Sequence, residues 1–166
     1  MSLIDVNEDV VNHISLSQPT HPNALFQYTY HYNFPTVATA WLTKYNYEKR
    51  TNLSTFVGVE QLDDDRIQFY RRLDNIGSTE IIYEKVIINR ADKTIISEGV
   101  APGLGEQEEI FVRHTVKPAE NDENKTVQQE LLIRDHGAKT IQLHMFRLNI
   151  ERMIKAINFN RFAGLQ

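Results

Sequence analysis

The last long segment of the chain, 139–162, has the hydrophobic pattern of an extended amphipathic helix. Its large apolar residues recur at steps of three and four: Leu143, Phe146, Ile150, Met153, Ile154 and Ile157. The opposite face is polar and carries Arg147, Glu151, Arg152, Lys155 and Asn158. Burying six such side chains gains on the order of 10 kcal/mol, but only against a wide apolar surface. The pattern therefore predicts a helix that packs one face on a sheet.

The segments before this helix alternate between apolar and polar residues, as β-strands do. The first, 24–32, places Phe26, Tyr28 and Tyr30 on one side of a pleat. A short helix is expected to begin near Pro35, where helical spacing follows up to Tyr45. The alternation then predicts strands over 53–62, 66–73, 78–88, 94–100, 107–116 and 126–134. Between them we expect an acidic turn at 63–65 and a charged loop over 117–125.

This order of elements predicts an α+β fold. A strand, a short helix, a six-stranded meander and a long terminal helix can form a curved antiparallel sheet of about seven strands that grips the C-terminal helix. That is the helix-grip pattern of START-like domains. The space between sheet and helix is either filled by side chains or left open as an apolar ligand cavity. The pattern alone leaves both alternatives open.

The N-terminal segment, 1–22, differs from the rest and is polar and acidic. Its few apolar residues, Leu3, Val6, Val10 and Ile14, lie on one face of a helix. A short helix that docks on a partner is one interpretation, and a disordered tail is the other. We therefore divide the chain into an N-terminal docking segment, 1–22, and one domain, 23–166.

Composition narrows the class of protein. A chain of 166 residues with 41% apolar content suits a single core, and a net charge of −4 argues against nucleic acid as a partner. Cysteine is absent, which excludes disulfides and thiolate chemistry. No apolar run approaches the roughly 20 residues of a membrane span, so we expect no transmembrane span. The first basic residue is Lys44, which argues against an Arg-rich presequence or a secretory signal.

Several short motifs resemble one family. The segment 34–45 reads FPTVATAWLTKY, and it is followed by VGV at 57–59 and RRL at 71–73. A later segment, 146–152, reads FRLNIER. In this order, and over about 26–162, the chain resembles the PRELI (slowmo-like) family, whose fold is a START-like helix-grip.

The resemblance implies a non-enzymatic mitochondrial domain that carries phosphatidic acid or phosphatidylserine across the intermembrane space. Lys44, Arg72 and Arg152 match basic positions of the family, and the resemblance implies that they hold the lipid phosphate. The alternative is that these three are surface residues with exposed charges. Trp41 and Tyr45 are candidates for the mouth of a lipid pocket, although an aromatic residue on the inner face of a short helix is more often part of the core.

The chain also departs from this family. After the first helix, Tyr45 is followed by Asn46, Tyr47 and Glu48, where the family has Pro-Asn-Pro. Only four residues separate Leu73 from the expected strand at Ser78, where the family has a long lid. A lid admits and seals a ligand.

We therefore rank an accessory subunit of a mitochondrial inner-membrane assembly, of the respiratory-chain or ATP synthase type, above a phospholipid-transfer protein. Its partners would be other subunits of that assembly and an acidic phospholipid. It would lie in the intermembrane space or at the inner-membrane surface. The six histidines lack the spacing of a metal helix, and no nucleophile and base form a pair. We expect no metal, no enzymatic activity and no cofactor other than a bound phospholipid.

Overall fold

A computed structural model describes residues 14–47, 54–73, 82–101, 109–132 and 139–164. Within these residues the helices are α2 (Phe34–Thr43) and α3 (Lys139–Phe162). The strands described there are β1 (Ala24–Tyr30), β2 (Ser54–Gln61), β3 (Arg66–Leu73), β4 (Ile82–Asn89), β5 (Thr94–Ala101), β6 (Glu109–Ala119) and β7 (Asp122–Leu132). The bounds of α3 are those that the hydrophobic pattern predicts.

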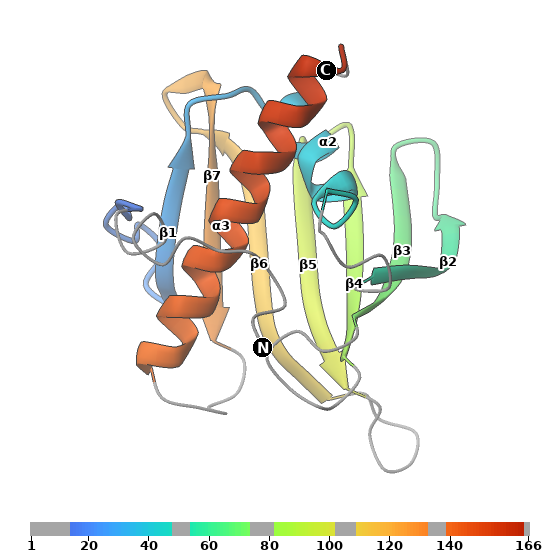
Figure 1. Ribbon diagram of the computed structural model, residues 1–166, viewed down its shortest axis with the longest axis horizontal. Helices are drawn as coiled ribbons and strands as arrows, with labels where there is room; N and C mark the ends of the chain where they lie inside the picture. The colour runs from blue at the N-terminus through green and yellow to red at the C-terminus, as the bar shows by residue number, and fades with distance from the viewer. Residues whose placement is uncertain (1–13, 48–53, 74–81, 102–108, 133–138, 165–166) are drawn as a thin grey trace.

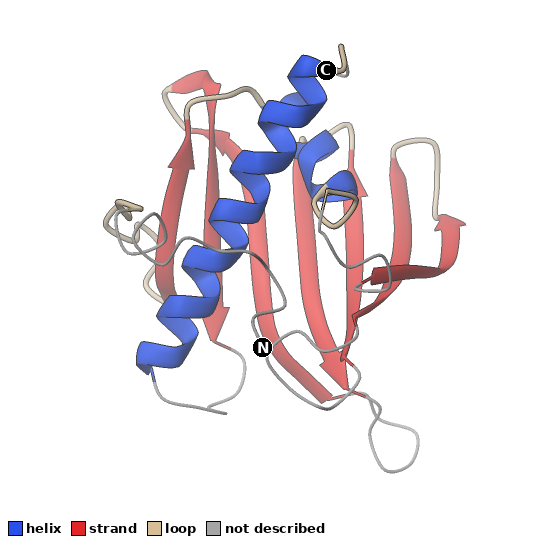
Figure 2. Ribbon diagram, viewed as in Figure 1, coloured by secondary structure: helices blue, strands red, loops and turns tan. Residues whose placement is uncertain are grey.

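The seven strands form one antiparallel sheet in the order β1-β7-β6-β5-β4-β3-β2. In the sheet, β1 is therefore separated from β2, the next strand in the sequence, and pairs with β7, the last strand in the sequence. Helix α3 runs diagonally across one face of the sheet, and α2 packs beside it (Figures 1 and 2). Strands β2 and β3 extend the sheet to the side away from α3 (Figure 1). This is the expected α+β, helix-grip architecture, and we call the sheet face toward α3 the inner face.

The core lies between α3 and the inner face. Phe146, Ile150, Met153 and Ile157 of α3 are buried, and Leu143 and Ile154 pack against the same cluster. From the sheet, Phe26 meets Phe146 with ring centroids 5.6 Å apart. The apolar stripe of α3 is therefore buried as its spacing predicts.

The start of helix α2 is fixed by the residues of its first turn. Asn33 is the N-cap, and its side-chain oxygen accepts a hydrogen bond from the Thr36 amide at 3.1 Å. Pro35 follows in the first turn, where its missing N–H costs nothing. The helix then ends at Lys44, the C-cap, whose side chain turns into the core.

One sequence prediction about the strands is wrong in the described residues. The charged segment 117–125 is not a loop, because β6 and β7 run through it and leave only Glu120 and Asn121 as the turn. The polar face of α3 is partly buried. Glu151 and Arg152 are both buried, and α2 packs beside α3 with Tyr45 against Arg152.

The N-terminal segment is described from Ile14 onward, and there it lies on the domain. The Ser17 amide donates to the Gln27 carbonyl at 2.9 Å, so this segment bridges to the outer edge of β1. Ile14 and Leu16 pack against the core. The expected boundary at residue 22 therefore does not separate residues 14–22 from the domain. Leu3, Val6 and Val10 lie outside the described residues.

Candidate functional site

A cluster of charged side chains is buried where α2, β3, β4 and α3 meet. Lys44, Arg71 and Glu84 are exposed by only 3%, 1% and 5%. The ammonium nitrogen of Lys44 lies 3.2 Å from Glu84 Oε2. Arg71 Nε donates to Glu84 Oε1 at 3.0 Å, and Arg71 Nη2 contacts the same oxygen. One carboxylate is therefore shared by two cations inside the protein.

The strand register brings Arg71 and Glu84 together. They are direct partners across the β3–β4 pair, and both face the inner side of the sheet, as Phe69 and Val86 do. Arg71 Nη1 also donates to the main-chain carbonyl of Trp41 at 2.8 Å. Carbonyls at the C-terminal end of a helix lack partners within the helix. Arg71 thus fixes the end of α2, and Lys44 with it.

Helix α3 completes the cluster with Asn149 and Arg152. Lys44 Nζ donates to Asn149 Oδ1 at 3.1 Å. The Tyr45 ring centroid lies 4.8 Å from the guanidinium carbon of Arg71 and 4.9 Å from that of Arg152. Cations over aromatic rings are stabilised by the ring's charge distribution. The aromatic residues therefore help to hold three cations close together.

In the described part of this cluster two buried cations share one carboxylate. Lys44 and Arg71 both contact Glu84, and Arg152 lies against the Tyr45 ring. Burial on its own would raise the pKa of Glu84, but Arg71 and Lys44 outweigh it and lower that pKa to about 2. Burial, together with the nearby charges of Arg71 and Arg152, lowers the pKa of Lys44 to about 7 against the opposing effect of Glu84. The carboxylate is firmly ionised, whereas the ammonium is close to losing its proton at neutral pH.

Hydrogen-bond donors are also in excess around Lys44. The indole Nε1 of Trp41 and the amide Nδ2 of Asn149 are buried without a hydrogen-bond partner. Both residues contact Lys44, whose Nζ lies 3.7 Å from the Trp41 ring centroid. Buried polar groups are normally paired. Two cations on one carboxylate, together with these two donors, suit an anion with several acceptor oxygens, such as a phosphate.

The structure brings together two of the three predicted phosphate-binding residues. Lys44 and Arg152 both lie in the cluster. Arg72 does not, because consecutive residues of a strand face opposite sides, and its exposed side chain lies on the outer side of β3. Arg71 takes its place. The alternation of β3 indicates that Arg71 faces inward, because Phe69 and Leu73, two residues away on either side, are on the inner face.

The two predicted pocket-mouth residues lie elsewhere than expected. Trp41 is fully buried in the core and so does not line a mouth. Tyr45 is partly buried, between the guanidinium groups of Arg71 and Arg152. Of the four residues predicted to dock on a partner, Ile14 packs against this chain's own core. Leu3, Val6 and Val10 lie outside the described residues.

Glu84 and Asn149 were missed from sequence. Glu84 lies in a strand whose charged residues gave no reason to expect burial. Asn149 is part of the FRLNIER segment but was not singled out. Only the pairing of β3 with β4, and of α2 with α3, places them beside Lys44.

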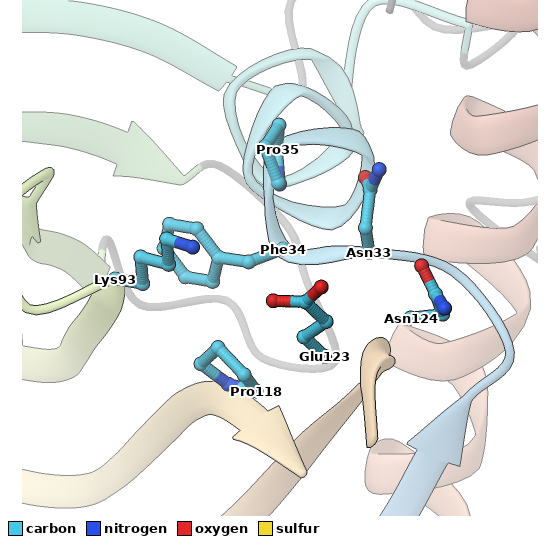
Figure 3. Close-up of a pocket in the computed structure, with 7 residues that line it drawn as sticks. All are labelled: Asn33, Phe34, Pro35, Lys93, Pro118, Glu123 and Asn124. Atoms are coloured by element: carbon cyan, nitrogen blue, oxygen red, sulfur yellow. The ribbon is translucent and has the colours of Figure 1, made fainter.

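A hollow of about 190 Å³ lies at the other end of α2 (Figure 3). Lys93 from the β4–β5 turn and Glu123 from β7 face the start of the helix there, around Phe34 (Figure 3). Of its seven lining residues only Phe34 is buried. Its charges are opposite and exposed to solvent, so it is a weaker candidate than the buried cluster.

In the described ranges, no group of three or more His, Asp or Glu side chains is placed to hold a metal ion. His114 Nε2 lies 3.0 Å from Glu130 Oε1, as an isolated pair within the sheet. Within the described helices, none is long and apolar enough to cross a membrane.

Comparison with known proteins adds no assignment. No protein-family model matches the chain, and no curated protein sequence matches it.

Proposed function

We propose that this chain is a non-enzymatic helix-grip domain that binds the phosphate group of an acidic phospholipid at Lys44, Arg71 and Arg152. The observation that supports the proposal is the buried cluster, where Lys44 and Arg71 share one carboxylate and two buried donors beside Lys44 have no partner among the described residues. A phosphate supplies both the negative charge and the acceptor oxygens. Retaining such a cluster without a ligand would cost stability, because buried charges are desolvated.

Binding of the phosphate would also change the protonation of Lys44. Its pKa is about 7 in the structure, chiefly because of burial. A second anion beside the ammonium favours the charged form and so raises this pKa. Lipid binding above pH 7 is then accompanied by proton uptake, and its affinity falls as the pH rises.

For the wider role we propose an accessory subunit of a mitochondrial inner-membrane assembly. The support comes from the resemblance to the PRELI family together with the short connection between β3 and β4. Eight residues, 74–81, join these strands, where that family has a lid. A domain that holds a lipid permanently needs no lid, whereas a carrier must load and release its cargo. Phospholipid transfer is the second candidate and ranks lower, because a carrier needs the lid that the family has at this position.

The binding proposal can be tested through Trp41, the single tryptophan of the chain, which contacts Lys44. Short-chain phosphatidic acid should change the Trp41 fluorescence in a saturable manner and raise the melting temperature. Phosphatidylcholine of the same chain length should do neither. Inorganic phosphate separates recognition of the phosphate alone from recognition of a lipid. If phosphatidic acid causes no change in fluorescence or melting, the proposal fails.

Variants make the test specific. Lys44→Met should weaken the binding of phosphatidic acid at least tenfold, because one charge-assisted hydrogen bond contributes about 1.5–3 kcal/mol. Arg72→Ala is the matched control on the outer side of β3 and should bind as wild type. Equal losses in both variants would indicate binding to general surface charge.

The accessory role has a separate test. The chain should migrate with a large membrane complex on native gels of mitochondria. Val6→Glu combined with Val10→Glu should release it while its melting temperature stays unchanged. Transfer of fluorescent phosphatidic acid between liposomes should be slow or absent. Rapid transfer by a chain that migrates alone would favour the carrier instead.

A further inference from the structure

The two edges of the sheet differ in how they are covered. At β1 the Ser17 amide pairs with the Gln27 carbonyl at 2.9 Å. At β2, the opposite edge of the sheet, no strand among the described residues pairs with the side of β2 that faces away from β3. Instead three apolar side chains are exposed there: Phe56 by 51%, Val57 by 59% and Val59 by 69%. Bare edge strands with exposed apolar residues are templates for pairing with another chain.

A bulge gives β2 an unusual symmetry. Phe56 pairs with Arg71 and Gly58 with Tyr70, so Val57 is an extra residue. Beyond the bulge, Val59 pairs with Phe69 on the inner face, and Phe56 is also on that face. Thr55 and Glu60, which pair with Arg72 and Gln68, both lie on the outer face. Read from either end, the strand therefore presents its faces in the same order.

This symmetry matches β2 to itself in one antiparallel register. Phe56 then lies opposite the partner's Val59, and both are on the inner face. Thr55 lies opposite the partner's Glu60 on the outer face, and Ser54 opposite the partner's Gln61. A shift by one residue would place inner-face residues opposite outer-face residues. Aromatic and β-branched residues form favourable cross-strand pairs.

Charge favours the same arrangement. Glu60 is the single charged residue of β2, and in this register it meets a hydroxyl group and not a second carboxylate. The acidic turn Asp63, Asp64 and Asp65 follows one end of the strand. In an antiparallel pair the two acidic turns project to opposite ends, so they do not repel one another. The same turn would be repelled by a membrane of acidic lipids.

We propose that β2 pairs with β2 of a second copy of this chain, so that the two sheets become continuous across a two-fold axis. The axis is perpendicular to the sheet, since inner-face residues meet inner-face residues. The helices of both copies then lie on the same side. Such isologous pairing is the commonest form of homodimer.

A charge exchange across the two-fold axis tests this register. Sedimentation velocity of the full chain at roughly 1–100 µM should show a monomer–dimer equilibrium. Thr55→Glu puts a new carboxylate opposite the partner's Glu60 at two symmetric positions and should weaken the dimer about tenfold. Glu60→Lys alone should leave dimerisation unchanged. The two substitutions together should restore the dimer, because the new charges attract.

Melting curves of all three variants show whether the monomer remains folded, which is expected because both positions are exposed. A chain that stays monomeric over the whole concentration range overturns the proposal. So does a dimer that Thr55→Glu leaves intact, or one that the double variant does not restore. Binding of the β2 surface to liposomes or to a different protein, with no dimer formed, overturns it as well.

Discussion

Two regions of the interior are buried to a similar degree but are built from different chemistry. Around β1 and β7, Phe146 packs on Phe26, and the hydroxyl of Tyr30 donates to Gln128 Oε1 at 2.6 Å. Around β3 and β4, burial encloses the ion cluster of Lys44, Arg71 and Glu84. We refer to these as the apolar region and the charged region.

The apolar region and the charged region contribute differently to the stability of the fold. Burial of apolar surface stabilises the fold directly. Buried ion pairs contribute little net stability, because desolvation offsets their attraction, although removing one partner is costly. The apolar region therefore accounts for the fold. The charged region needs another reason to exist, and binding of an anion is the reason that we propose.

The largest effect should come from placing a charge in the apolar region. Ile150 is fully buried on α3, and Ile150→Asp should cost about 4 kcal/mol or more, enough to unfold a domain of ordinary stability. Circular dichroism melting curves measure this. Asn158→Asp, at an exposed position of the same helix, is the control and should melt as wild type. A cooperative transition for Ile150→Asp at the wild-type temperature would contradict the packing described here.

Removing the one carboxylate of the charged region should have the next largest effect. Glu84→Gln leaves Lys44 and Arg71 without the carboxylate that they share and should lower the free energy of unfolding by about 3–5 kcal/mol. Combining it with Lys44→Met should recover part of the loss, since one unpaired cation is then removed. Urea titrations give both values. Losses that simply add would mean that Lys44 and Glu84 do not interact.

A smaller effect should appear with pH. The pKa of Lys44 is about 7 in the folded chain and about 10.5 when unfolded. Between these values the unfolded state binds more protons, so stability rises as the pH increases from 7 towards 9. Lys44→Met should lack this rise. Urea titrations at pH 7, 8 and 9 test the difference, and parallel curves for the two proteins would show that Lys44 is charged in both states.

The smallest effect is expected at Arg72, which lies next to Arg71 in β3 but on the exposed side. Arg72→Ala should change stability by less than about 0.5 kcal/mol, as exposed substitutions usually do. Arg71→Ala should cost several times more, because it removes the shared partner of Glu84 and of the α2 carbonyls. Urea denaturation of the two variants side by side measures the ratio. Similar losses would mean that the faces of β3 are assigned the wrong way round.

Long periodic elements could be predicted from the sequence, but their exceptions could not. The stripe of α3 was predicted with its bounds because six apolar residues recur over many turns. The extension of β6 and β7 through 117–125 was missed because Lys117, Pro118 and Glu123 resemble loop residues. Pro118 nevertheless pairs with Thr126 within the sheet. Tertiary pairing there overrides local propensity.

The candidate site was predicted in part. Lys44 and Arg152 were found by resemblance, and a motif that ends in Arg-Leu directed attention to Arg72. The alternation of β3 would have pointed to Arg71, since every second residue faces inward. Glu84 could not be predicted, because its contact with Lys44 depends on how α2 is placed over the β3–β4 pair. Residue patterns report the face of an element but not what lies opposite it.

The pairing of β1 with β7 has a consequence for synthesis of the chain. Thr29 pairs with Val127, so β1 cannot enter the sheet until β7 has left the ribosome. At a synthesis rate of about 5–20 residues per second, the aromatic side chains of β1 remain outside the sheet for several seconds before β7 is made. During this time Phe26 and Tyr30 have no sheet to cover them. Nascent chains should therefore be substrates for chaperones that bind aromatic segments, until the last strand emerges and closes the sheet.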